Sequence, residues 1–102
     1  MAGVEDDHDR VAVLALDPVL DLKAASPLAE HFLAHRGSDI AIDASAVERL
    51  GAQSLQVLLS AIATWQADGR AVDFKDPSDA FVDGLHVFGL DPEHILKPHK
   101  TA

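Results

Sequence analysis

The chain has 102 residues, contains no cysteine and carries a formal charge of −9. This length predicts one domain with one modest core, and the acidity opposes binding to nucleic acids or anionic membranes while favouring a basic partner. The absence of cysteine excludes disulfides and a thiol nucleophile. It also fits the reducing cytoplasm, where we expect the protein, since residues 1–10 are too acidic for a signal peptide and no apolar run approaches the ~20 residues that span a bilayer.

The first predicted strand is the apolar run at residues 11–16. Both of its faces are apolar, so we place it in the interior of a sheet. A turn at Asp17-Pro18 precedes residues 19–22, which we interpret as a short second strand. Residues 1–10 are strongly acidic, and we interpret them as a flexible N-terminus outside the domain.

The first predicted helix covers residues 27–36, because Ser26-Pro27 is typical of a helix start and Gly37 of a helix end. Its predicted buried stripe consists of Leu28, Ala29, Phe32 and Leu33. His31 and His35 lie four residues apart on one helical face, a spacing that two metal ligands can share. The sequence positions no third ligand, so we predict no metal site.

A strand at residues 39–42 leads into the longest helical pattern of the chain, at residues 52–67. At about 100° per residue, its core face consists of Leu55, Leu58, Leu59, Ile62 and Ala63, flanked by Ala52, Ala61 and Trp65. We expect the tryptophan to pack in the core rather than to anchor a partner. A further strand at residues 71–75 completes a βαβ unit, which predicts that the two strands are parallel, with the later one near an edge.

The last predicted helix covers residues 77–88, where Asp76-Pro77 opens the helix and Gly89 ends it. Ile95-Leu96 is predicted to dock as a short final element, before a flexible C-terminus at residues 97–102. The fold class is therefore α/β, with a small mixed β-sheet of four to five strands covered by three or four helices in one domain at residues 11–96.

The side of the long helix that faces away from the core is uncharged. Between Arg49 and Asp68 no residue carries a charge, and this side consists of Gln53, Gln56, Val57, Ser60 and Thr64. An exposed helix face normally carries Lys or Glu, whereas charge depletion marks the centre of protein interfaces. Two interpretations stay open, because either a partner protein or another element of the same chain covers this side.

The order of these features resembles the central signature of the STAS domain, the family of anti-sigma factor antagonists and sulfate-transporter domains. Members show an aspartate at a turn after a strand, then a cluster of small residues, of the Asp-Ser-Ser-Gly or Asp-Thr-Ala-Gly type, that opens a helix. Here Asp43 and Ser45 stand at the turn, and Gly51-Ala52-Gln53-Ser54 occupy the cluster. The resemblance extends over residues 11–90.

The resemblance implies a regulatory binding module rather than an enzyme, with no cofactor, and the chain has no catalytic or nucleotide-binding motif. The expected partner is an anti-sigma factor, a histidine-kinase-like protein or a chemotaxis signalling protein. The loop at residues 43–54 and the following helix would bind it, through Asp43, Ser45, Gly51, Ala52, Gln53, Ser54, Gln56, Val57 and Ser60. From the residues alone, Asp43 and Ser45 are simply the residues of a turn.

In the family, a partner kinase phosphorylates the Ser or Thr that follows the Asp of the cluster. An ungapped alignment places Ala52 at that position, so we expect no phosphorylation there, with Ser54 as a poor substitute and Ser45 as a minor candidate. Two alternative functions stay open, namely a STAS subunit of a lipid-transport ABC complex and a sensor of nucleotides or other small ligands.

Overall fold

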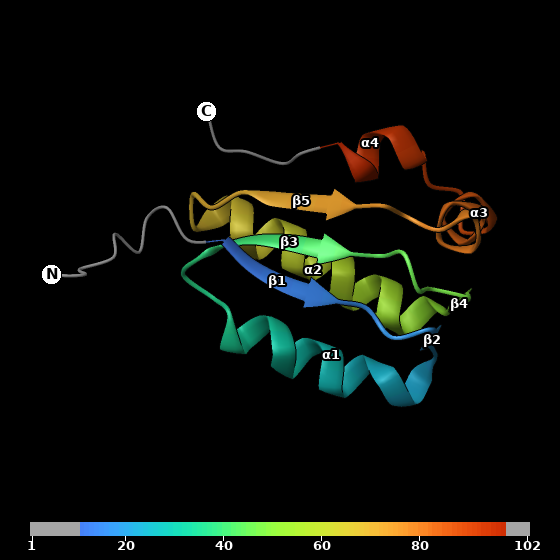
Figure 1. Cartoon of the computed structure of the whole chain (residues 1–102), viewed down its shortest axis with the longest axis horizontal. Helices are drawn as coiled ribbons and strands as arrows, with labels where there is room; N and C mark the ends of the chain where they lie inside the picture. Colours follow the sequence, from blue (N-terminus) through green and yellow to red (C-terminus); the bar gives the residue numbers. More distant parts are fainter. Residues whose placement is uncertain (1–10, 98–102) are drawn as a thin grey trace, which may run out of the picture.

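The computed structural model describes residues 11–97, which form five strands and four helices (Figure 1). In chain order these are β1 (Val11–Ala15), β2 (Val19–Leu20), α1 (Leu22–Ala34), β3 (Asp39–Asp43), β4 (Arg49–Leu50), α2 (Ala52–Ala67), β5 (Val72–Lys75), α3 (Asp79–Val87) and α4 (Pro92–Leu96). The α/β class is confirmed. Residues 1–10 and 98–102, which fall in the predicted flexible termini, lie outside the described residues.

The strands form a three-stranded sheet in the order β1-β3-β5 and a separate pair, β2-β4. All strand pairs among residues 11–97 are parallel, whereas the sequence predicted a mixed sheet. The βαβ unit of β3, α2 and β5 is confirmed, with Ile40 opposite Val72. Helices α1 and α2 lie on one side of the larger sheet (Figure 1), and they cover the face that carries Leu14, Ile42 and Phe74.

The prediction that the first strand lies in the interior of the sheet is wrong. Only β3 pairs with β1, so β1 is an edge strand. The side chains of Val11 and Val13 are 54% and 69% exposed on the face that no helix covers. Although both faces of β1 are apolar, helices cover only the face that carries Leu14.

Two helices begin at other residues than predicted. Helix α1 begins at Leu22, where the Oδ1 atom of Asp21 accepts a hydrogen bond from the Ala24 N–H at 3.1 Å. Pro27 therefore lies inside the helix, at an exposed position, where it removes one backbone hydrogen bond. Similarly, α3 begins after Ser78, whose hydroxyl accepts the Phe81 N–H at 3.0 Å. In both cases an oxygen side chain sets the start and the proline does not.

Helix α2 has the predicted bounds, and its buried side is turned toward α1. Leu55, Leu58 and Ile62 are buried as predicted, whereas Leu59 is half-buried and Ala63 is exposed. The additional buried residues are Ser54, Ala61 and Trp65. The packing prediction for the tryptophan is confirmed, since its ring meets Phe32 edge-on at 5.8 Å and its Nε1–H donates to the Ser38 carbonyl at 2.7 Å. None of the helices within residues 11–97 has the length and apolar character needed to cross a bilayer.

Candidate functional site

The candidate site begins with the side of α2 that faces away from the core. Its first turns expose Ala52, Gln53, Gln56 and Ser60 to solvent, and Val57 is half-buried beside them. The helix contains no charged residue over its full length. Isolated surface helices are usually made soluble by charged side chains, so this uncharged surface is unusual for solvent exposure.

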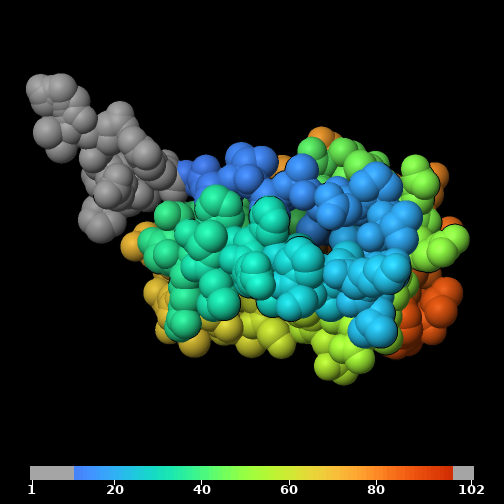
Figure 2. Space-filling model, turned by 90° about the horizontal axis from the view of Figure 1, so that it is seen from below, coloured from blue at the N-terminus to red at the C-terminus, as the bar shows by residue number. Residues whose placement is uncertain are grey.

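A groove of about 380 Å³ runs between α1 and α2. Helix α1 contributes Ala29 and Leu33 to its wall, and α2 contributes Gln53, Gln56, Val57, Ser60, Ala61, Thr64 and Trp65. Figure 2 looks onto α1, with α2 below it. The interpretation that another element of the same chain covers the uncharged surface holds in part, because α1 packs against one flank of it and leaves the rest open.

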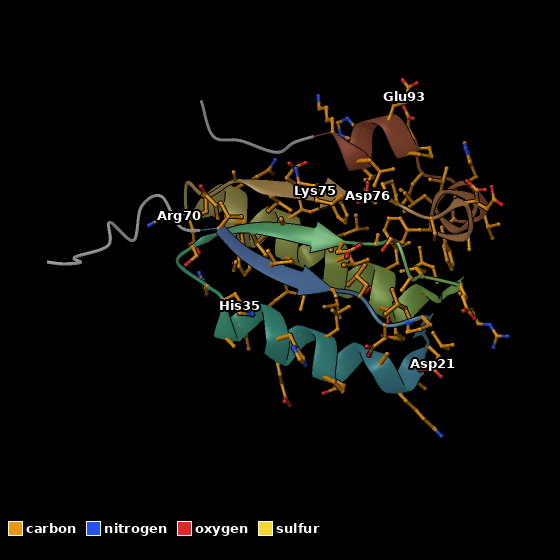
Figure 3. All side chains as sticks on the ribbon, in the orientation of Figure 1. Asp21, His35, Arg70, Lys75, Asp76 and Glu93 are labelled. Atoms are coloured by element: carbon orange, nitrogen blue, oxygen red, sulfur yellow. The ribbon has the colours of Figure 1, made fainter. Side chains whose placement is uncertain are left out.

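Two polar contacts join α1 and α2 at opposite ends of the groove. At one end the Ser54 hydroxyl donates to the Asp21 carbonyl oxygen at 3.0 Å. At the other end the Nε and Nη2 atoms of Arg36 donate to the two carboxylate oxygens of Asp68, at 2.9 and 3.2 Å. Figure 3 marks the two ends of α1 with Asp21 and His35. These two contacts hold α1 and α2 together at both ends of the groove.

The opening of α2 depends on a close approach between its first residue and strand β2. Gly51 is the N-cap, and its N–H donates to the Leu20 carbonyl at 2.7 Å. A Cβ atom at Gly51 would lie only 3.0 Å from that same carbonyl oxygen. The small residue therefore has a structural reason that is independent of any partner. Ala52 follows at the exposed first position of the helix.

Ser54 lies away from the surface that was predicted to bind a partner. Its side chain is fully buried, and its hydroxyl is engaged with Asp21. A partner or a kinase reaches this oxygen only after α1 and α2 separate. The serine therefore supports the position of α1 in this structure, and it is not part of the exposed surface.

Asp43 and Ser45 form a turn at the carboxyl end of β3. The Oδ1 atom of Asp43 accepts the Ser45 N–H at 2.9 Å, and hydrogen bonds from the Ser45 side chain and backbone hold the pKa of Asp43 below its ordinary value. In the register of the sheet, Asp43 lies between Ala15 and Lys75. This row belongs to the open face of the sheet, because side chains alternate between faces and Ile42 is covered by the helices.

The predicted binding residues thus fall into two groups on opposite faces of the sheet. Gln53, Gln56, Val57 and Ser60 come together along the groove, while Asp43 lies on the other face and Ser45 in the turn that follows it. Sequence analysis missed the contribution of α1, because it assigned Leu33 to the core, and this side chain is 65% exposed. The helical period alone would have separated Leu33 from the buried residues, since at about 100° per residue it lies about 140° from Leu28 and about 100° from Phe32, wherever the helix starts.

Within residues 11–97 no three His, Cys, Asp or Glu side chains come together as metal ligands. His31 is exposed and His35 is half-buried on α1. The groove is lined by amide, hydroxyl and apolar side chains.

A family model described as "Mlab, STAS domain" matches residues 4–97, which is nearly the whole chain. Separate comparisons with curated proteins and with solved structures gave no significant match. The match to the family model agrees with the resemblance carried by Asp43, Ser45 and the small residues from Gly51 to Ser54.

Proposed function

The chain belongs to the STAS domain family, and we propose that it is a non-enzymatic regulatory module that binds a partner protein through the opening and the uncharged side of α2. The observation that carries this proposal is the uncharged helix surface beside a groove whose two ends are held by Ser54 and Arg36. Charge depletion of this kind is typical of the centre of protein interfaces. The partner is an anti-sigma factor, a related kinase-like protein or a chemotaxis signalling protein.

The module acts by occupancy, either by sequestering its partner or by holding it beside another protein. It works without the phospho-switch of the family, because Ala52 stands at the switch position and has no hydroxyl. Its neighbour Ser54 is buried and engaged with Asp21, which makes it a poor acceptor. Binding is then regulated by the concentration of the partner and of its competitors.

A second candidate function is that of a STAS subunit in a lipid-transport ABC complex. The description of the matched family model carries the name Mlab. A permanent subunit also has no need to be released by phosphorylation, which fits the alanine at position 52. In this case α2 would bind the ATPase of the transporter.

Site-specific photocrosslinking in cells that express the protein separates these functions. A photoreactive amino acid replaces Gln56, which is exposed on α2, and in the control replaces Val13, which is exposed on the opposite face of the sheet. We expect one partner to be crosslinked when the photoreactive residue stands at position 56 and not when it stands at position 13. A kinase-like protein or a chemotaxis protein would support the first function, and an ATPase would support the second.

The purified partner is then tested against Gln56→Asp, which puts a charge into a surface that would be desolvated on binding. The change should weaken binding at least tenfold and leave the melting temperature within about 3 °C, since exposed positions change stability little. Unchanged affinity would remove this side of α2 from the interface.

A further inference from the structure

We propose that the α1–α2 groove receives an amphipathic helix of the partner, with its apolar stripe against Leu33 and Val57 and with basic residues along its edges. This inference rests on the proposed binding function and adds α1 as the second wall of the site. It therefore defines the form and the chemistry of the segment that binds.

The first observation is a second uncharged stripe, on α1. Leu22, Ser26, Ala29 and Leu33 follow each other at the helical spacing of three or four residues. Leu22 and Leu33 are 71% and 65% exposed, whereas the core contacts of the same helix come from Leu28 and Phe32. The stripe thus carries an exposed leucine at each end, and Leu33 is the one that lines the groove.

The second observation is that the two stripes match in length. Leu22 to Leu33 on α1 and Gln53 to Thr64 on α2 each span eleven positions (33 − 22 and 64 − 53), or about 16 Å at about 1.5 Å per residue. Both helices run back from the carboxyl ends of parallel strands, so they lie parallel to each other. A third helix of about three turns that lies along α2 would therefore contact both walls beside Ala29 and Leu33, the residues of the α1 stripe that line the groove.

The backbone of the groove walls favours a helix over an extended segment. An extended peptide gains most of its affinity from main-chain hydrogen bonds to a free strand edge. Most N–H and C=O groups of α1 and α2 are bonded within the helices, so an extended peptide would find few main-chain partners on the groove walls. A bound helix satisfies its main chain internally and contributes side chains alone.

The charges define the edges of the bound helix. The groove walls are uncharged, and the charges of Arg36 and Asp68 at one end neutralise each other. Glu30 and Lys23 lie on the outer side of α1, and the whole chain carries −9. A helix with an apolar stripe and basic edges thus meets no like charge in the groove, and the net field of the chain attracts it.

Trp65 gives a direct signal for occupancy of the groove. It is the only tryptophan of the chain, and it contributes to the groove wall although it is only 2% exposed. The probe is a synthetic helical peptide of leucine and lysine, with leucines at the i, i+3, i+4, i+7 spacing and no tryptophan. A peptide of the same composition, with the leucines scrambled around the helix, is the control for charge alone.

The peptide is titrated against the full chain, Leu33→Glu and Val87→Glu. Val87 is 80% exposed on α3 and is not part of the groove, so it matches the change in charge without touching the site. We expect a saturable change in Trp65 fluorescence with the wild type and Val87→Glu. Leu33→Glu should bind at least tenfold more weakly although it is more acidic, and the scrambled peptide should give no change.

Equal or tighter binding by Leu33→Glu would show that charge alone attracts the peptide and would overturn the proposal, as would no signal with the wild type. A dimer in sedimentation that Leu33→Glu dissociates would assign the groove to a second copy of the chain and would also overturn it. The two proposals can fail separately. If Gln56→Asp loses the partner and Leu33→Glu retains it, the proposed binding function stands, but the partner does not place a helix in the groove.

Discussion

Replacement of Leu58 and of Leu59 by alanine tests how α2 is turned against the core. The sequence pattern buries both leucines, but only Leu58 is fully buried, at 1% exposure, while Leu59 is half-buried at the margin of the core. The two adjacent variants remove the same atoms from one helix. The difference between their stabilities therefore reports burial and not helix propensity.

The expected magnitudes follow from burial. Leu58→Ala should lower the free energy of unfolding by about 2–5 kcal/mol, because it leaves a cavity in a packed core. Leu59→Ala should lower it by about 1–2 kcal/mol, since part of that side chain already meets water. A domain of this size has about 5–15 kcal/mol in total, so the first variant loses a large share of its stability.

Urea unfolding followed by the fluorescence of Trp65 gives both numbers. A loss of about 3 kcal/mol moves the midpoint by about 2 M at a slope of about 1.5 kcal/mol per M. Gln56→Ala, on the exposed side of the same helix, is the control and should stay within about 0.5 kcal/mol. Equal losses for the two leucine variants, or a larger loss for Leu59→Ala, would refute the described orientation of α2.

Three further predictions concern the opening and the far end of α2. Gly51→Ala should cost about 1–3 kcal/mol, because its Cβ would lie 3.0 Å from the Leu20 carbonyl oxygen; an unchanged melting temperature would show that β2 can move away. The wild type incubated with ATP and the kinase of its pathway should gain no phosphoryl group by intact mass, whereas Ala52→Ser should gain one; a phosphorylated wild type would show that the switch has moved. Hydrogen bonds from Arg36 lower the pKa of Asp68, so this carboxylate stabilises the fold above its unfolded pKa of about 4 and loses that contribution as the pH falls through its lower folded pKa. Asp68→Asn should therefore make the melting temperature depend less on pH in this acidic range. An unchanged pH profile would contradict the contact between Arg36 and Asp68.

The sequence predicted α2 well because local signals agreed there. The helical period runs without a breaker from Ala52 to the glycine at position 69, and a glycine also stands at the N-cap. A short strand pattern stands on either side of this helix, with Ile40 and Ile42 before it and Val72 and Phe74 after it, so the βαβ unit followed. Strong periodicity over many residues is the most reliable signal that a single sequence offers.

The start of α1 was missed because two signals competed. Ser26-Pro27 has the residues of a helix start, but Asp21 caps the helix earlier and one proline is tolerated at an exposed position. The pair of strands β2 and β4 was missed in part, since two residues give no period. These are local errors, and they arise where a single side chain decides between two starts.

The groove could not be predicted in full, because it depends on how two helices are placed by the sheet. The sequence identified the uncharged side of α2 but left its cover undecided between a partner and the same chain. In the structure α1 covers part of this side, since Ala29 and Leu33 form one wall of the groove, and Gln56 and Ser60 remain exposed on the other wall. A long-range arrangement of this kind has no signature in either helix alone.

Positions 52 and 54 at the opening of α2 are the two at which a phospho-switch would be sought. In a phospho-switched member, an exposed hydroxyl at the helix start receives a charge that repels or retains the partner. Here the exposed position is Ala52, and the nearby hydroxyl of Ser54 holds Asp21 at 0% exposure. A phosphoryl group on Ser54 would need α1 and α2 to separate, and this would also destroy the groove. Modification of Ser54 would therefore be coupled to loss of the groove itself.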